Sequence, residues 1–167
     1  MEYLDVYDEN AQKTGKVIVR GTPLAQGEYS MAVHLYIYDE NGCFLIQKRS
    51  KNKKSLPGIW SVTCGAVSSG EDSLHAGIRE AREEIGLPLK ERQLVFVSRI
   101  KRRRSFIDVY FVRDDFHIED CVLQKEEVDE VRLTSASALL DMIKASEKAN
   151  STYTFTVEKA MRDRKLI

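Results

Sequence analysis

Three glutamates lie within five residues near the middle of the chain, in the run REAREEIG: Glu80, Glu83 and Glu84. On an α-helix, which turns by about 100° per residue, these carboxylates share an arc roughly 100° wide. Like charges three or four positions apart destabilise an isolated helix by about 0.2–0.5 kcal/mol per pair. Clustered carboxylates are also the ligands that Mg²⁺ and Mn²⁺ prefer, usually together with substrate phosphates. The spacing of the glutamates alone leaves both a solvated acidic surface and a metal site open.

An apolar stripe predicts the helix that must carry these glutamates. Its members follow a 4-3-4 spacing: Leu74, Ile78, Ala81 and Ile85. Ser68 and Glu71 stand at the spacing of a capping box and predict the start of the helix. Gly86 predicts its end. We therefore expect a helix with its apolar stripe in the core and its three glutamates facing away from that stripe.

The wider spacing around the helix resembles the signature of the Nudix hydrolases at every defined position. Gly65 is followed after five residues by Glu71, and after seven more by the run REAREEIGL, which begins at Arg79. The resemblance implies a strand, loop and helix that hold a divalent cation, Mg²⁺ or Mn²⁺, against the diphosphate of a small-molecule substrate. One departure is Ala66, where many members of the family have a second glycine.

The resemblance also implies a function for each signature residue. The expected metal ligands are the carboxylates of Glu80, Glu83 and Glu84 and the carbonyl oxygen of Gly65. Glu71 and Arg79 would brace the loop against the helix. The carboxylate that activates the attacking water is expected to be Glu83 or Glu80, or Glu127 from a later loop.

This set of residues suits the attack of water on a diphosphate. A metal ion neutralises the charge of the phosphates and lowers the pKa of the bound water. A carboxylate can then act as the general base, and no Ser, Cys or His nucleophile is needed. The leading hypothesis is a metal-dependent hydrolase that cleaves a diphosphate bond in a nucleoside diphosphate derivative or a related organic diphosphate.

A second resemblance supplies the main alternative. The segment QKRSKNKKSLPGIWSVTCGA and the opening of the chain are similar to the Nudix subgroup that resembles type I isopentenyl diphosphate isomerase. Cys64 and Glu84 lie where that isomerase has its catalytic pair. Its metal-binding histidines are replaced here by Ala66 and Ser30, and the histidines present stand elsewhere: His34, His75 and His117. Isomerisation is thus the first alternative, and a non-catalytic nucleotide-binding Nudix module is the second.

Basic residues before the signature are candidates for binding the substrate. Arg49 and Lys54 belong to a cluster that could contact phosphates, although basic loops are also commonly solvated. The 26 acidic and 26 basic side chains cancel, so net charge gives no clear indication of a nucleic-acid partner. The sequence does not exclude a homodimer.

The composition is typical of a single enzyme domain. The 167 residues are 43% hydrophobic and 31% charged, with no apolar run near the ~18 residues that span a bilayer. There is no secretion signal at the N-terminus, and three cysteines are too few for a disulfide framework. We expect one domain over residues 1–167 with a short N-terminal strand extension over about 1–27, a cytoplasmic location and no membrane partner.

Alternating and periodic apolar residues predict the remaining elements. Strands are expected over residues 2–7, 16–20, 31–38, 43–48, 60–64, 94–100, 106–112 and 129–133. Residues 31–48 read as a hairpin around an Asn-Gly turn, and residues 94–112 as a second hairpin-like pair. Helices are expected over 135–148 and 154–164. Together with the resemblance, this pattern predicts an α/β (α+β) fold, an α/β/α sandwich with a mixed sheet.

Overall fold

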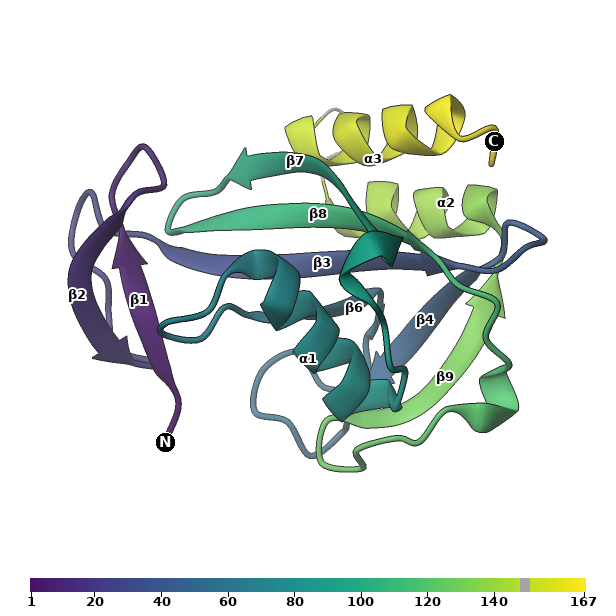
Figure 1. The fold of residues 1–167 in the computed structure, drawn as a ribbon, viewed down its shortest axis with the longest axis horizontal. Helices are drawn as coiled ribbons and strands as arrows, with labels where there is room; N and C mark the ends of the chain where they lie inside the picture. The colour runs from purple at the N-terminus through teal and green to yellow at the C-terminus, as the bar shows by residue number, and fades with distance from the viewer. Residues whose placement is uncertain (148–150) are drawn as a thin grey trace.

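A mixed β-sheet forms the centre of the molecule in the computed structural model, which describes residues 1–147 and 151–167 (Figure 1). Within those residues its seven strands are β3 (Ser30–Tyr38), β4 (Phe44–Arg49), β5 (Trp60–Ser61), β6 (Thr63–Ala66), β7 (Leu94–Lys101), β8 (Ser105–Arg113) and β9 (Val128–Thr134). Five of them follow the order β5-β4-β3-β8-β7, while β6 pairs with β3 and β9 pairs with β4. The pairing of β3 with β8 is parallel and the other pairings are antiparallel.

Helices cover both faces of this sheet. Helix α1 (Ser73–Ile85) lies on one face, and α2 (Ala136–Ser146) and α3 (Thr152–Asp163) lie on the other. Two short 3-10 helices occupy the connections, η1 (Glu91–Gln93) and η2 (Ile118–Asp120). The predicted α/β/α sandwich with a mixed sheet is therefore confirmed. The predicted helix over 135–148 ends at Ser146, and its last predicted residue, 148, lies outside the described residues.

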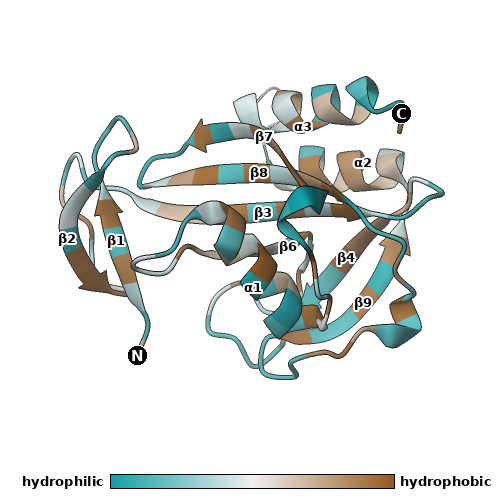
Figure 2. Cartoon of the chain, in the orientation of Figure 1, coloured by the Kyte–Doolittle hydropathy of each residue, from teal (hydrophilic) through white to brown (hydrophobic). Residues whose placement is uncertain are grey.

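Strand β3 shows how the two layers of core are built. Val33, Leu35 and Ile37 are fully buried on the side of α1, whereas Tyr36 is buried on the side of α2 and α3. Because successive side chains of a strand point to opposite faces, both faces of this central strand must be apolar. Figure 2 shows the resulting brown bands along β3, and the alternation of brown and teal along β9, which is less buried.

The predicted hairpin over residues 31–48 is formed only at its turn. Strands β3 and β4 are in register at Tyr38 and Phe44. Beyond that pair β4 diverges and pairs with β9, while β3 pairs with β8 from Ser30 to Tyr38. The Asn-Gly turn is a local signal, whereas the partner of each strand is set by burial over the whole sheet. The predicted strand over 60–64 is likewise two strands, because β5 pairs with β4 and β6 pairs with β3.

A separate two-stranded sheet precedes the main one. Strands β1 (Tyr3–Tyr7) and β2 (Lys13–Val19) pair antiparallel and lie at one end of the molecule, beside the loop that leads into α1 (Figure 1). Strand β2 begins at Lys13, three residues earlier than predicted. Among the described residues, no helix has both the length and the apolar character needed to cross a bilayer.

Candidate functional site

Helix α1 carries the candidate glutamates, and its two ends are defined by specific residues. The Asp72 side chain caps the N-terminus and accepts a hydrogen bond from the backbone N–H of His75 at 2.9 Å. The predicted capping box was wrong, because Glu71 accepts from the backbone N–H of Ser68 at 3.0 Å and so closes a turn that precedes the helix. The predicted end at Gly86 is confirmed. This glycine adopts φ 74°, in the left-handed region, and its N–H donates to the carbonyls of Ala81 and Arg82.

Two of the three helix glutamates are buried, which corrects the expectation that all three face away from the core. Glu80 is 8% exposed and Glu84 is 6% exposed, whereas the Glu83 side chain is 54% exposed. The helix approaches the sheet closely at Gly77, where a Cβ would lie 2.9 Å from a methyl carbon of Leu35. Small residues at this contact let the helix rest near the strands, so the neighbouring carboxylates are covered rather than solvated.

Gly65 in β6 provides the space that the Glu80 carboxylate occupies. A Cβ at position 65 would lie 2.5 Å from Cγ of Glu80 and would overlap its carboxylate. Real Cβ atoms do not approach so closely, so only glycine fits here with Glu80 in this position. The signature glycine and the first helix glutamate therefore form a single packed contact.

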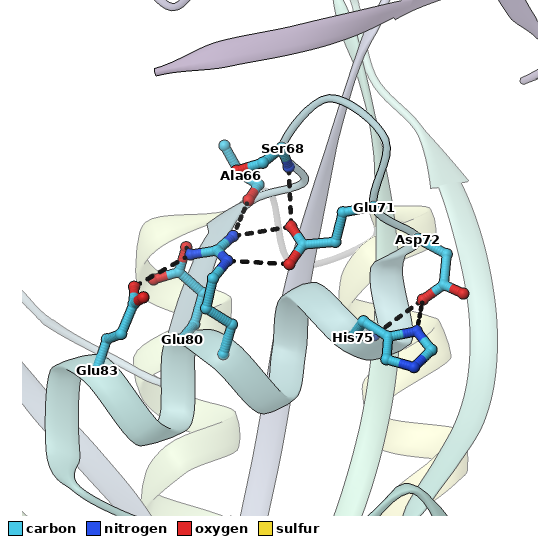
Figure 3. A network of polar contacts seen from close by, with 8 residues as sticks. Ala66, Ser68, Glu71, Asp72, His75, Glu80 and Glu83 are labelled. Atoms are coloured by element: carbon cyan, nitrogen blue, oxygen red, sulfur yellow. Dashed lines mark hydrogen bonds and ion pairs between the residues drawn. The ribbon is translucent and has the colours of Figure 1, made fainter. Parts of the chain in front are cut away.

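Arg79 links the signature loop to the helix (Figure 3). Its guanidinium donates to both carboxylate oxygens of Glu71 at 3.0 Å and to the carbonyl of Ala66 at 3.0 Å. It also donates to Glu80 at 2.8 Å and to Glu83 at 3.3 Å. Bidentate pairing of a guanidinium with a carboxylate gives both strength and direction. This geometry is compatible with the predicted bracing by Glu71 and Arg79.

Glu84 is held by a buried amide that the sequence did not single out. Nε2 of Gln47 donates to Glu84 at 2.6 Å, and Oγ1 of Thr63 donates to Oε1 of Gln47 at 3.0 Å. Burial raises the pKa of Glu84 to about 7, although the hydrogen bond from Gln47 acts in the opposite direction. Burial also raises the pKa of Glu80, and Arg79 opposes that rise. Because Gln47 falls in an ordinary strand pattern, nothing in the local sequence marks it.

The loop that carries Glu127 is fastened to the last turn of α1. The backbone N–H of Val122 donates to the carbonyl of Ile85, and that of Gln124 donates to the carbonyl of Glu84. The Glu127 carboxylate pairs with Nζ of Lys53 at 2.6 Å. Residues 37 and 40 positions apart thus meet at the end of the helix, because the C-terminal carbonyls of α1 serve as acceptors for the loop.

These side chains surround one cleft of about 320 Å³. It is lined by Glu2, Arg20, Arg49, Cys64, Gly65, Ser68, Arg79, Glu80, Glu83, Glu84, Gln124 and Glu127. All the predicted metal and catalytic residues are in this set, and so is Arg49. Glu71 lies behind Arg79, and Lys54 is exposed outside the lining residues, so its predicted contact with substrate stays a prediction.

The cleft offers hard oxygen donors for a metal ion. In the part of the chain that the structure describes, no three His, Cys, Asp or Glu side chains converge on a single point. Instead Glu80 and Glu83 share Arg79, Glu84 bonds to Gln47, and Glu127 bonds to Lys53. The donor chemistry fits Mg²⁺ or Mn²⁺, and the tight contact of Glu80 with Gly65 brings a carboxylate beside a strand backbone. Binding would require Glu83 to turn, which its exposed side chain permits.

Cys64 also lines the cleft, while the three histidines do not. Burial raises the pKa of the Cys64 thiol to about 12, so the thiol is neutral near pH 7. Nδ1 of His34 lies 2.6 Å from the Tyr153 hydroxyl, in the layer between the sheet and α3. His75 pairs with Asp72 at the start of α1.

Comparison with known proteins identifies the family of this chain. The family model described as the NUDIX domain matches residues 28–155. A Nudix hydrolase of Listeria monocytogenes, itself uncharacterized, is 36% identical over 140 residues, which cover 83% of each chain. Nudix hydrolase 3 of Arabidopsis thaliana is 35% identical over 78% of this chain but 19% of its own. An isopentenyl-diphosphate Delta-isomerase of Streptomyces griseus is 35% identical over 50% of this chain and 43% of its own.

Solved structures share the fold. A crystal structure of a Deinococcus radiodurans protein superposes with a TM-score of 0.73 and 26% identity, covering 95% of this chain and 98% of that one. A MutT protein of Methanosarcina mazei gives a TM-score of 0.59 at 22% identity, covering 82% of this chain and 96% of its own. The chain therefore belongs to the Nudix family, and its place among the Nudix hydrolases makes it a pyrophosphohydrolase.

Proposed function

We propose that this protein hydrolyses a diphosphate bond in a nucleoside diphosphate derivative or a related organic diphosphate, with Mg²⁺ or Mn²⁺ as cofactor. The observation that carries the proposal is the contact between Glu80 and Gly65 in a cleft that Glu83, Glu84 and Glu127 also line. Five glutamates and three arginines line this cleft, an arrangement suited to a metal ion together with an anionic ligand.

The residues that would hold the metal are Glu80, Glu83, Glu84 and the carbonyl oxygen of Gly65. When bound, the metal would neutralise phosphate charge and lower the pKa of the attacking water. Glu80 and Glu84 have little rotational freedom, because both are buried and hydrogen-bonded. Carboxylates that are already buried and held in position favour metal binding, because little conformational entropy is lost when the metal binds.

The general base is a glutamate that can reach water in the cleft. Glu83 has an exposed side chain and a single long contact to Arg79, so it is free to turn toward the substrate. Glu127 is held by Lys53 at 2.6 Å and would accept a proton once the substrate's phosphates compete for that lysine. Glu80 is the third candidate, although its bond to Arg79 favours the role of a ligand.

Binding of the phosphates is proposed to use Arg49 and, from the loop that follows it, Lys54. Arg49 donates through Nε to the Ser55 carbonyl at 2.7 Å, which fixes its guanidinium at the edge of the cleft. A small polar cleft with these cations suits the diphosphate itself, with the organic groups extending outward. The proposal includes a cytoplasmic location, a compartment compatible with such metabolites as substrates and with the free thiols of this protein.

The decisive experiment is turnover in water enriched in ¹⁸O. Nucleoside diphosphate derivatives, dinucleoside polyphosphates and isopentenyl diphosphate are offered with Mg²⁺ or Mn²⁺, and the products are weighed by mass spectrometry. A phosphate product that carries ¹⁸O identifies hydrolysis. Glu83→Gln and Glu84→Gln are expected to lower the rate by about a hundredfold or more. Glu91→Gln is the matched control, because Glu91 is exposed and lies outside the cleft.

Two outcomes would contradict the proposal. Wild-type rates in the Glu83 and Glu84 variants would exclude these carboxylates from the reaction. Conversion of isopentenyl diphosphate without incorporation of ¹⁸O would favour isomerisation, which the partial similarity to isomerases keeps as the second candidate. The positions of the three histidines outside the cleft argue against that candidate.

A further inference from the structure

The N-terminal hairpin of β1 and β2 supplies two residues to the cleft. Glu2 and Arg20 line it together with Glu80 and Glu127. Both residues precede the segment 28–155 that matches the family model. The hairpin is thus an addition to the matched domain that reaches its candidate active site.

Polar contacts fix the hairpin to the signature loop. The Asp5 carboxylate accepts from the Ser69 hydroxyl at 2.8 Å and from the backbone N–H of Gly70 at 3.0 Å. The backbone N–H of Ser69 donates to the carbonyl of Tyr3 at 2.8 Å. Lys13 pairs with the same Asp5 carboxylate at 2.7 Å. The hairpin and the loop therefore form one bonded unit, and the loop leads directly into α1.

An apolar contact reinforces this unit. Leu4, Val6 and Ile18 form a small buried cluster in the hairpin, and Ala66 of the signature strand packs against it. The place of Arg20 relative to the glutamates is consequently set by packing as well as by hydrogen bonds.

Arg20 and Glu2 form an ion pair at the mouth of the cleft. NH1 of Arg20 lies 2.7 Å from Oε2 of Glu2, and their backbones bond at 2.9 Å. The Arg20 side chain is 54% exposed, so most of its five N–H donors face solvent or the cleft. The pKa of Arg20 is raised chiefly by Glu2, with smaller effects in the same direction from the charges of Glu80 and Glu127.

The other two arginines of the cleft are bound to groups of the protein that a phosphate would not readily displace. Arg79 is fully engaged by the carboxylates and carbonyl of the signature. Arg49 uses Nε for the Ser55 carbonyl. A diphosphate needs cationic donors wherever its oxygens are not covered by metal, and Arg20 is a guanidinium whose present partner is one exchangeable carboxylate.

From this arrangement we infer that Arg20 binds a phosphate of the substrate from the hairpin side of the cleft, and that Glu2 is the counter-ion which this phosphate displaces. The inference rests on the proposed function and adds a phosphate-binding residue from outside the matched domain. Glu2 keeps Arg20 extended over the cleft between turnovers, and the diphosphate, which carries at least two negative charges, is the stronger partner when it arrives.

Binding of imidodiphosphate, whose bridging nitrogen resists hydrolysis, tests this inference by titration calorimetry in Mg²⁺. Arg20→Ala is expected to weaken binding by about tenfold to a hundredfold. Arg20→Lys is expected to recover part of the loss, because lysine restores the positive charge but not the paired N–H donors of the guanidinium. Glu2→Gln is expected to bind as tightly as wild type or tighter. Lys16→Ala is the matched control, because it breaks the Lys16–Glu28 pair at 2.8 Å in the same hairpin but away from the cleft.

The unfolding temperature of each variant detects damage to the fold. Titration with Mg²⁺ alone detects any change in metal binding, so that a change in imidodiphosphate binding can be interpreted by itself. Equal imidodiphosphate affinity in wild type and Arg20→Ala would overturn the inference and leave the proposed function intact. An equal loss in Lys16→Ala would also overturn it, because the hairpin and not the guanidinium would then be responsible. Failure of the wild type to bind imidodiphosphate in Mg²⁺ would overturn the proposed function and this inference together.

Discussion

Replacing Glu84 by glutamine is expected to stabilise the metal-free protein at pH 8 while it removes activity. The Glu84 carboxylate is 6% exposed, and burial raises its pKa from 4.5 to about 7. In the unfolded chain this group ionises freely above pH 4.5, whereas the folded protein resists ionisation until about pH 7. The penalty on folding is therefore absent at low pH, grows as the pH rises from 4.5 to about 7, and is constant above that.

The size of the effect follows from the shift in pKa. Each unit of difference between the folded and unfolded states corresponds to about 1.4 kcal/mol, so a folded pKa of about 7 implies a penalty of up to about 3 kcal/mol. Glutamine keeps the shape of the side chain and can still accept the hydrogen bond from Gln47. We expect Glu84→Gln to raise the free energy of unfolding by about 1–3 kcal/mol at pH 8.

Urea denaturation in EDTA, at intervals from pH 4 to pH 8.5, measures this difference. The gain should be near zero at pH 4 and should rise to its full value by pH 8. Glu83→Gln is the matched control, since it makes the same chemical change one residue earlier on a side chain that is 54% exposed. Its unfolding free energy should follow that of the wild type.

Addition of Mg²⁺ is then expected to reverse the order of stability of the two proteins. A cation that binds the native state stabilises it by mass action, and the wild type should gain more than Glu84→Gln. The reasoning would be refuted if Glu84→Gln were less stable than the wild type at pH 8 in EDTA. A gain of the same size at pH 4 and pH 8 would also refute it, because the effect would then not arise from ionisation.

Three further substitutions test separate parts of the structure. Gly65→Ala should lower turnover by about a hundredfold, because its methyl group would displace the Glu80 carboxylate, and circular dichroism should show a retained fold. Arg99→Met should lower the free energy of unfolding, measured in urea, by about 2–4 kcal/mol. The substitution removes the charged partner of the Asp108 carboxylate, which is 1% exposed and paired with Arg99 at 2.7 Å. The rate per folded molecule should not change. Cys64→Ala should keep hydrolysis within a few-fold of wild type, as expected for a thiol that is neutral near pH 7, and loss of all activity would instead support the isomerase alternative.

Most residues that line the candidate site could be predicted because they are close together in the sequence. The run from Gly65 to Leu87 lies on one strand, one turn and one helix, so its spacing is also its geometry. The end of the helix at Gly86 follows from the left-handed conformation that glycine adopts easily. The layers of the fold were also accessible, since alternating strands and amphipathic helices leave few ways to bury their apolar faces.

The burial of Glu80 and Glu84 could not be predicted from the helix alone. Periodicity gives the direction in which apolar side chains point, and it places these glutamates beside the stripe and not on it. Their exposure depends on how near the helix lies to the sheet, which is set by Gly77 and by the bare backbone of Gly65. Small residues are weak signals in a hydrophobic pattern, although they decide how closely two elements approach.

Contacts between distant segments were missed for a different reason. Gln47 in β4 contacts Glu84 in α1 only because the fold brings together residues 37 positions apart, and Arg20 reaches the cleft only because the hairpin bonds to the signature loop. The parallel pairing of β3 with β8 joins residues 75 positions apart and has no local signal. Such residues become candidates only after the pairing of the strands is known.

Ala66 shows how a departure from a family pattern can be understood physically. This chain has Ala66 where many members of the family have a second glycine next to Gly65. In the structure the Ala66 side chain packs against the apolar cluster of the N-terminal hairpin, and its carbonyl accepts a hydrogen bond from Arg79 at 3.0 Å. The steric need for glycine lies at position 65, where a Cβ would overlap Glu80, and that position is retained. The methyl group at position 66 thus adds an apolar contact to the hydrogen bonds between the hairpin and the signature loop, and so helps to connect the site to Arg20.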